Sequence, residues 1–240
     1  MRSFAFNAIF YPFTFLIVLG ALPLVLLPSR KPLACYLRGW ARATVGLMRH
    51  VAGIDVEVRG REHMPIDRPH IIAAKHQSEC DGIIVISLVP DIAFVAMKEL
   101  EKLPFVGPTL RKLEMIMVDT CGGGSERRAL IDGGRAAKDS DRSILIYPEG
   151  HLMAVGERER YRTGVYHLAT DLCMPVIPVA TNVGLRWDRR QKRKTPGPAV
   201  VSFLAPLEPT ADKAGFMQRL EDAIEAETAR LVHEHAPAGA

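Results

Sequence analysis

Short apolar runs alternate with helical stretches beyond Gly53 of this 240-residue chain, and this alternation constrains the fold more than any other feature. A half-buried strand is predicted where apolar and polar residues alternate, at residues 54–59. Buried strands are predicted at residues 71–74, 93–96, 115–118, 144–147 and 176–180, with helices that include residues 82–89, 125–138, 164–172 and 211–235. Strands separated by helices indicate an α/β fold with a mostly parallel or mixed central sheet flanked by helices.

The N-terminal segment, residues 3–29, contains no charged side chain. It is long enough to cross ~30 Å of hydrocarbon, and no convincing A-x-A cleavage site follows it, so we predict a retained membrane anchor rather than a cleaved signal peptide. Pro12 and Pro23 leave a re-entrant or interfacial arrangement open beside a straight span. Basic residues are more numerous after the segment than before it, which places the downstream domain on the cytoplasmic face of the inner membrane.

Residues 33–51 have the pattern of a basic amphipathic helix that carries Arg38, Trp40 and Arg42. Such a helix suits a lipid headgroup interface, and packing on its own domain is the open alternative. We therefore divide the chain into a membrane anchor with an interfacial helix, residues 1–52, and a second domain, residues 53–240.

The charge and cysteine content restrict the classes of partner. A net charge of +4 and a pI near 8.9 suit an anionic membrane surface or phosphorylated substrates, and no nucleic-acid-binding motif is present, so we predict no nucleic-acid partner. Four cysteines without a C-x-x-C pair predict neither a disulfide framework nor a zinc site, and no metal is expected. The run 186–194 is the strongest basic cluster and is either a solvated loop or a contact for anionic headgroups or coenzyme A phosphates.

A polar run, residues 75–81, lies between two apolar strings and contains His76 and Asp81. Five residues on a helix rotate a side chain by ~500°, and on a strand an odd separation places the two side chains on opposite faces. The pair can therefore meet only across a bend, where Asp81 would orient His76 as a general base. The alternative is a capping box in which Ser78 is the N-cap and Asp81 its partner, and the two interpretations are compatible.

Three polar residues follow predicted strands directly: His76, Asp119 and Glu149. Sites in parallel sheets gather at the carboxyl ends of strands, so one cleft is expected to hold all three. The glycine run 122–124 lacks the ending of a P-loop, and we interpret it as a turn with Ser125 as N-cap.

Four blocks in order now resemble the glycerolipid acyltransferase family, whose best-known members are the 1-acylglycerol-3-phosphate acyltransferases. They are residues 75–81 (KHQSECD); 98–107 (KELEKLPFVG) followed by 115–119 (MIMVD); 147–150 (YPEG) continued by 161–169 (YRTGVYHLA); and 176–180 (VIPVA) with Asn182 close behind. The resemblance covers residues 55–207 and makes the second domain an acyltransferase catalytic domain.

The resemblance implies that His76 and Asp81 are catalytic, and that substrate is bound by Lys98, Gly107, Glu149, Gly150, Arg160 and Arg162. It also implies no cofactor, with acyl-CoA or acyl carrier protein as acyl donor and a lysophospholipid of the membrane as acceptor. Two family arginines that would bind the acceptor's phosphate are replaced here, by Thr120 and Leu152. Lys98, Arg160 and Arg162 are the residues expected to compensate.

The chemistry requires a base for the acceptor hydroxyl, and a neutral imidazole held by a carboxylate is suited to take that proton. Backbone amides at residues 106–107 or near Ser78 are the candidate donors to the oxyanion. An alternative in which Cys80 carries the acyl group is disfavoured by its acidic neighbours, which raise the pKa of a thiol.

We therefore predict a membrane enzyme of phospholipid synthesis that acylates 1-acylglycerol-3-phosphate to phosphatidic acid. Three alternatives stay open: an acyltransferase for another lyso-lipid, such as lyso-ornithine lipid; a hydrolase that uses the same dyad on water, against which the absence of G-x-S-x-G counts; and a catalytically decayed, membrane-anchored lipid-binding scaffold.

Overall fold

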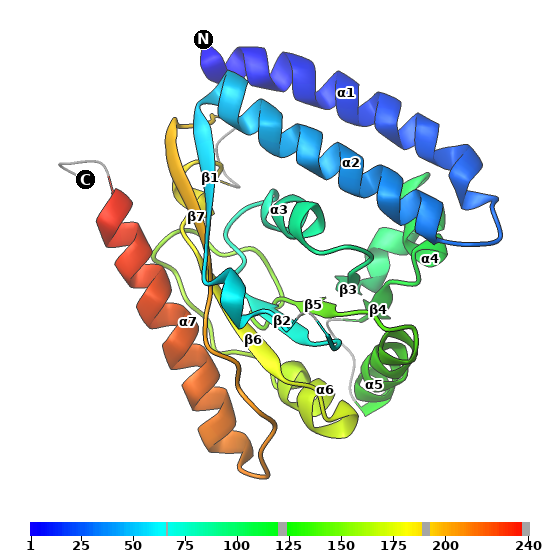
Figure 1. The fold of residues 1–240 in the computed structure, drawn as a ribbon, viewed down its shortest axis with the longest axis vertical. Helices are drawn as coiled ribbons and strands as arrows, with labels where there is room; N and C mark the ends of the chain where they lie inside the picture. The colour runs from blue at the N-terminus through cyan, green and yellow to red at the C-terminus, as the bar shows by residue number, and fades with distance from the viewer. Residues whose placement is uncertain (66, 120–123, 189–192, 237–240) are drawn as a thin grey trace.

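A seven-stranded sheet forms the centre of the computed structural model, which describes residues 1–65, 67–119, 124–188 and 193–236 (Figure 1). Its strand order is β1 (Ile54–Arg59), β7 (Gly197–Phe203), β6 (Val176–Thr181), β2 (Ile71–Ala74), β5 (Ile144–Ile146), β3 (Ala93–Met97) and β4 (Ile116–Val118). Every neighbouring pair is parallel except β6 and β7, which are antiparallel. The predicted mixed, mostly parallel sheet flanked by helices is confirmed.

Two hydrophobic cores cover the two faces of this sheet, because successive side chains of a strand point to opposite faces. On β2, Ile72 belongs to the core beneath α1 (Arg2–Val25), α2 (Lys31–Leu47) and α3 (Asp81–Leu88). Ile71 belongs to the core beneath α5 (Gly124–Asp139), α6 (Gly164–Leu172) and α7 (Lys213–His235). Leu145 and Ile144 divide in the same way on β5. The central strands are thus buried on both sides, which explains their continuous apolar runs.

Two elements were not predicted from the sequence, and one helix N-cap was predicted at the wrong residue. β7 begins with Gly197 and Pro198, residues typical of turns, and it becomes a strand because β1 and β6 pair with its two edges. The short helix α4 (Val106–Lys112) lies in a segment interpreted only as part of a family block, and Phe105 precedes it with a φ of 65°. α5 already begins at Gly124, so Ser125 lies inside the helix and its prediction as N-cap is wrong.

The N-terminal helices α1 and α2 form an antiparallel pair along the domain (Figure 1). Phe6 and Phe10 of α1 each meet the ring of Trp187 edge-on at 5.3 Å between centroids. Ser3 Oγ accepts from the backbone N–H of Lys194 at 2.8 Å. The π-helical turn Met48–Ala52 follows α2 and ends at the predicted domain boundary, residue 52. Residues on both sides of this boundary pack in the same hydrophobic core.

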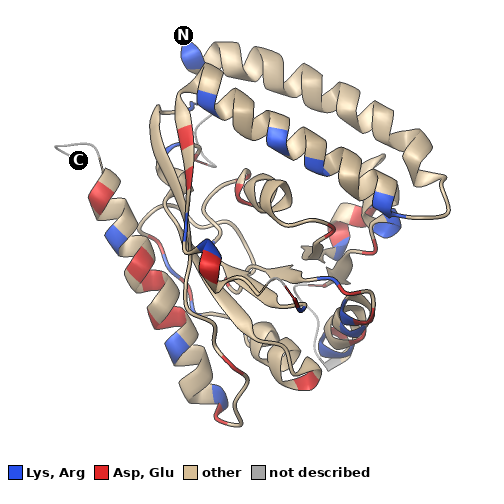
Figure 2. Ribbon diagram, viewed as in Figure 1, with Lys and Arg blue, Asp and Glu red and all other residues tan. Residues whose placement is uncertain are grey.

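No charged residue lies on α1 beyond its first turn, as Figure 2 shows. Its 24 residues are the one helix among the described residues that is long and apolar enough to cross a membrane. Large exposed side chains on it and on the following turn are Phe4, Ile9, Tyr11, Phe15, Leu16, Leu19, Leu26 and Leu27. This helix is the candidate membrane anchor.

Two basic residues of α2, Arg38 and Arg42, bind to their own domain. The guanidinium of Arg38 donates to the carbonyl of Leu88 at 3.1 Å, and Arg42 donates to the carbonyl of Ser87 at 3.4 Å. These carbonyls end α3 and lack helical partners, so the two arginines complete that helix. Trp40 donates to Thr14 Oγ1 of α1 at 3.2 Å. Of the two expectations for this helix, packing on its own domain describes these three side chains.

Candidate active site

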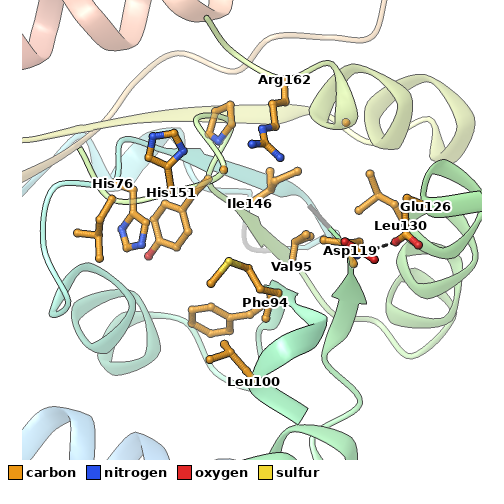
Figure 3. Close-up of a pocket in the computed structure, with 18 of the residues that line it drawn as sticks. His76, Phe94, Val95, Leu100, Asp119, Glu126, Leu130, Ile146, His151 and Arg162 are labelled. Carbon is orange, nitrogen blue, oxygen red and sulfur yellow. Dashed lines mark hydrogen bonds between the residues drawn. The ribbon is translucent and has the colours of Figure 1, made fainter. Parts of the chain in front are cut away.

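A cavity of about 640 Å³ opens at the carboxyl ends of β2, β3, β4 and β5 (Figure 3). The parallel direction of these strands brings the segments that follow them to one edge of the sheet. Its wall is largely apolar and includes Phe94, Val95, Ala96, Met97, Leu100, Val118, Leu130 and Ile146. Its polar lining includes His76, Glu79, Asp119, Glu126, Arg127, His151, Arg162 and His167.

His76 and Asp81 meet across the bend between β2 and α3. Nδ1 of His76 lies 3.1 Å from Oδ2 of Asp81, and the same oxygen accepts the backbone N–H groups of Gln77 and Ser78, both at 2.8 Å. Three donors fix this carboxylate, whose side chain is 6% exposed. With Nδ1–H donating to Asp81, the other ring nitrogen, Nε2, is left as a proton acceptor for a molecule in the cavity.

The capping interpretation holds only in part. Asp81 accepts the Ser78 N–H, as a capping box requires, but α3 begins at Asp81 itself and Cys80 is the residue before it. Ser78 Oγ accepts the Cys80 N–H at 3.3 Å instead of that of Asp81. The polar run therefore closes a tight bend around the carboxylate, and that bend aims His76 at the cavity.

Tyr147 supports the imidazole from one side. The two rings stack with centroids 3.9 Å apart and an interplanar angle of 15°. Burial raises the pKa of Tyr147 well above its ordinary value, so its hydroxyl stays protonated at neutral pH. Stacking and the bond to Asp81 together restrict the ring to one orientation.

Glu149 lies beneath the cavity rather than in its wall. Its side chain is fully buried, Oε1 accepts from Lys75 Nζ at 2.6 Å, and Oε2 accepts the backbone N–H of His76 at 3.1 Å. It is therefore not placed to touch substrate, and it holds the peptide that carries the imidazole. Of the three residues expected in one cleft, His76 and Asp119 line the cavity.

The other residues predicted to bind substrate fall into two groups. Gly150 and Arg162 line the cavity, and Gly150 has a φ of 78° that suits glycine at the turn after β5. Lys98 and Arg160 are exposed and lie outside its lining. Gly107 also lies outside it, where a Cβ would collide with the Glu101 carbonyl oxygen, so glycine is required there by close packing.

Three of the backbone amides predicted as donors to the oxyanion already have acceptors. The N–H groups of Val106 and Gly107 donate to the carbonyls of Pro104 and Leu103, at 2.8 and 2.9 Å. The Ser78 N–H donates to Asp81. These three N–H groups are therefore not available as donors in this conformation.

Arg127 is a lining residue that the sequence did not single out. It lies in the first turn of α5, and its guanidinium is 3.5 Å from Asp171 Oδ2. Its signal was the arginine pair 127–128, which opens a helix just after a strand end. Leu152 lines the cavity as well, whereas Thr120 and the glycines at 122 and 123 lie outside the described residues.

The described residues at the two ends of the basic cluster 186–194 include two buried cations. Arg186 is buried and donates to the carbonyls of Pro198 and His235, at 3.0 and 2.9 Å. Lys194 is buried, with its ammonium 4.2 Å from the Trp187 ring centroid. These two cations are therefore not solvated, and residues 189–192 lie outside the described chain. Among the described residues, no group of three or more His, Cys, Asp or Glu is placed to hold a metal ion.

Cys80 does not reach the cavity. Its thiol is fully buried, is absent from the lining, and lies 3.1 Å from Ser78 Oγ. Burial, reinforced by the negative charge of Asp81, raises the pKa of the thiol far above its ordinary value. This conformation therefore gives no support to the alternative in which Cys80 carries the acyl group.

Replacing Cys80 with alanine is expected to leave acyl-group chemistry within about threefold of wild type, because the thiol stays protonated and has no path to substrate. Deleting a buried sulfur should lower the free energy of unfolding by about 1 kcal/mol. Turnover and thermal unfolding measure both quantities. The exposed Cys173 is the matched control for labelling with iodoacetamide: it should react in the native protein, and rapid native labelling of Cys80 would contradict this account.

Comparisons with known proteins show similar sequences and a similar fold. The family model described as Acyltransferase matches residues 55–182. The chain is 32% identical over 172 residues to a 1-acyl-sn-glycerol-3-phosphate acyltransferase of Pseudomonas aeruginosa, an alignment that covers 72% of this chain and 66% of the relative. It is 24% identical over 162 residues to the 1-acyl-sn-glycerol-3-phosphate acyltransferase alpha of Homo sapiens, covering 67% and 57%. The chain thus spans less than two thirds of the length of these curated relatives.

The fold is similar to that of the 1-acyl-sn-glycerophosphate (LPA) acyltransferase from Thermotoga maritima, with a TM-score of 0.75 and 20% sequence identity. The match covers 98% of this chain and 97% of the other. At that identity the likeness concerns the fold alone, and it extends over the N-terminal helices as well as the sheet.

Proposed function

The chain belongs to the glycerolipid acyltransferase family, and from this premise we propose that it transfers a fatty acyl group from a thioester donor to the free hydroxyl of 1-acylglycerol-3-phosphate, forming phosphatidic acid. The observation that carries the proposal is the dyad: His76 lines an apolar cavity, with Nδ1 held by a buried carboxylate. The donor is acyl-CoA or acyl carrier protein.

The dyad supplies the proton transfer. Nε2 of His76 takes the proton of the acceptor hydroxyl as its oxygen attacks the thioester carbonyl, and Asp81 stabilises the imidazolium that forms. When the tetrahedral intermediate collapses, the carbon–sulfur bond breaks and the imidazolium returns the proton to the thiolate. The hydroxyl of the substrate thus occupies the role that a serine has in a hydrolytic triad.

The apolar wall suits an acyl chain, and the exposed face of α1 suits the membrane that supplies the acceptor. Because α1 lies against α2 and the domain, we propose that it enters the membrane from the cytoplasmic side and keeps the cavity close to the lipid surface. The basic residues that follow the segment support that side.

Two arginines line the described cavity wall, Arg127 and Arg162, and we propose that they bind the acceptor's phosphate. A guanidinium offers paired N–H donors that match phosphate oxygens. They occupy the role of the family arginines that Thr120 and Leu152 replace. Lys98 and Arg160, the other residues expected to compensate, lie outside the lining.

Arg162→Met and Arg127→Met are each expected to raise the KM for 1-acylglycerol-3-phosphate by about 10- to 100-fold, because a hydrogen bond to a charged group contributes about 1.5–3 kcal/mol. Methionine keeps the apolar stem, and kcat should fall less than KM rises. The neighbours Arg160→Met and Arg128→Met, which lie outside the lining, are the controls and should leave KM within twofold. Equal effects in lining and control variants would contradict the phosphate site.

The activity is tested with purified protein in detergent, labelled acyl-CoA or acyl carrier protein, and a panel of lyso-lipids. Transfer to 1-acylglycerol-3-phosphate above all other acceptors is the expected result. Preference for lyso-ornithine lipid would reassign the acceptor, and release of free fatty acid without an acceptor would indicate a hydrolase. Folded protein that transfers to no acceptor would favour the lipid-binding scaffold.

A further inference from the structure

Lys75 precedes the catalytic histidine and is buried, with 1% of its side chain exposed. Its ammonium donates to three oxygens: Glu149 Oε1 at 2.6 Å, Glu225 Oε1 at 2.7 Å and the carbonyl of Glu157 at 3.2 Å. Lysine is almost never fully buried unless it is paired, so this network requires an explanation.

Glu149 connects this ammonium to the base. One oxygen of the carboxylate accepts from Lys75, and the other accepts the backbone N–H of His76. The carbonyl of His76 accepts the N–H of Met153 at 2.8 Å, so the loop after β5 holds the His76 peptide from both sides. Burial raises the pKa of Glu149, and the Lys75 ammonium opposes that rise, so the ion pair favours the carboxylate form that accepts both bonds.

Glu225 reaches the network from α7, 150 residues along the chain from Lys75. Its Oε1 accepts from Lys75 and also from the hydroxyl of Tyr161, at 2.8 Å. The side chain is 11% exposed. The C-terminal helix therefore has a charged contact to the segment that carries the catalytic base.

We propose that Lys75 and Glu225 are positioning residues for acyl transfer: they hold Glu149, which fixes the peptide of His76 so that its imidazole stays between Asp81 and the cavity. This inference rests on the proposed function of His76 as the base. The charges make the two positions unequal. Without Lys75, two largely buried carboxylates repel across the gap; without Glu225, Lys75 still pairs with Glu149.

The test is a double-mutant cycle of Lys75→Met, Glu225→Gln and both together, with kcat, KM and thermal unfolding measured for each. Lys75→Met should lower kcat about 30-fold and Glu225→Gln about fivefold, and both should keep KM within twofold of wild type. Effects of this size are within the range of coupling free energies between residues of one ion network. In the Lys75→Met background, Glu225→Gln should raise kcat about fivefold because it removes one of the two unpaired carboxylates.

The matched control is Asp222→Asn, which neutralises an exposed carboxylate on the same helix. Asp222 accepts from Gln218 Nε2 at 2.8 Å, a bond that an asparagine carbonyl can keep, so this variant should behave as wild type. Glu225→Gln should lower kcat in the wild-type background and raise it in the Lys75→Met background. A general loss of packing would not reverse the sign of this effect. Additive losses of kcat, or a wild-type kcat in Glu225→Gln, would overturn the proposal. If Lys75→Met does not fold, Glu225→Gln against Asp222→Asn still decides it, because a fivefold loss of kcat at constant KM is required.

Amide hydrogen exchange over residues 75–81 separates this proposal from the proposed function, since it needs no turnover. Exchange at this segment should be faster in Lys75→Met and slower again in the double variant. If the wild-type protein transfers to no acceptor while the variants show this exchange pattern, the acyltransferase proposal is overturned. The network's hold on the His76 peptide would still stand. Unchanged exchange in all variants would overturn the network's role directly.

Discussion

His76→Ala is expected to lower the rate of acyl transfer by about a hundred- to ten-thousand-fold, the range that a positioned general base contributes. Two other histidines line the described cavity wall, His151 and His167, but His151 pairs with the exposed Glu159 instead of a buried carboxylate, and burial lowers the pKa of His167. The fold should survive, because Asp81 keeps two backbone donors when the imidazole is removed. The loss of one hydrogen bond should lower the free energy of unfolding by about 1 kcal/mol.

The measurement is transfer of a labelled acyl group in detergent, with circular dichroism and thermal unfolding to show that the variant is folded. His151→Ala is the matched control, because it removes an imidazole from the same cavity, and its rate should stay within about threefold of wild type. The KM for acceptor should change little in His76→Ala, since the base acts in the transition state. Transfer at the wild-type rate by folded His76→Ala would remove the proposed mechanism.

Local sequence patterns were sufficient for the sheet's central strands and for the bend that joins His76 to Asp81, whereas the catalytic role of this pair was implied by the family resemblance. Buried strands such as 71–74 are continuous apolar runs, and the five-residue spacing of His76 and Asp81 has one solution, a bend. Both depend on residues close in sequence, where backbone geometry leaves few alternatives. The same is true of the long apolar helix α1, which its lack of charge identifies.

Features that depend on distant partners could not be predicted. β7 carries turn residues at its start and is a strand only because β1 and β6 flank it. Glu149 directly follows a strand, a position typical of a cavity residue, but its ion pair with Lys75 lies beneath the cavity wall. The third member of this network, Glu225, lies on α7. The sequence pattern of Arg38 and Arg42 is that of cations at a membrane interface. In the fold, they bind the last carbonyl groups of α3. In each case the deciding contact is between segments far apart in sequence.

Asp81→Asn is expected to lower kcat by up to about four orders of magnitude, the loss that the corresponding change causes in a serine-protease triad. The Oδ2 position of Asp81 accepts three hydrogen bonds, from His76 and from the Gln77 and Ser78 N–H groups. Asparagine can keep its carbonyl oxygen there, so the bend should persist. It loses the negative charge that stabilises the imidazolium, and its amide would stand at Oδ1, where no described residue offers a partner.

A buried amide without an acceptor costs about 1–3 kcal/mol, so Asp81→Asn should unfold at a lower temperature but remain folded at about 25 °C. The decisive measurement is kcat for acyl transfer, taken beside thermal unfolding of the same preparation. Glu79→Gln removes a different carboxylate from the cavity wall and should leave kcat within about threefold of wild type. A folded Asp81→Asn variant with the wild-type kcat would show that Asp81 only closes the bend and has no part in proton transfer.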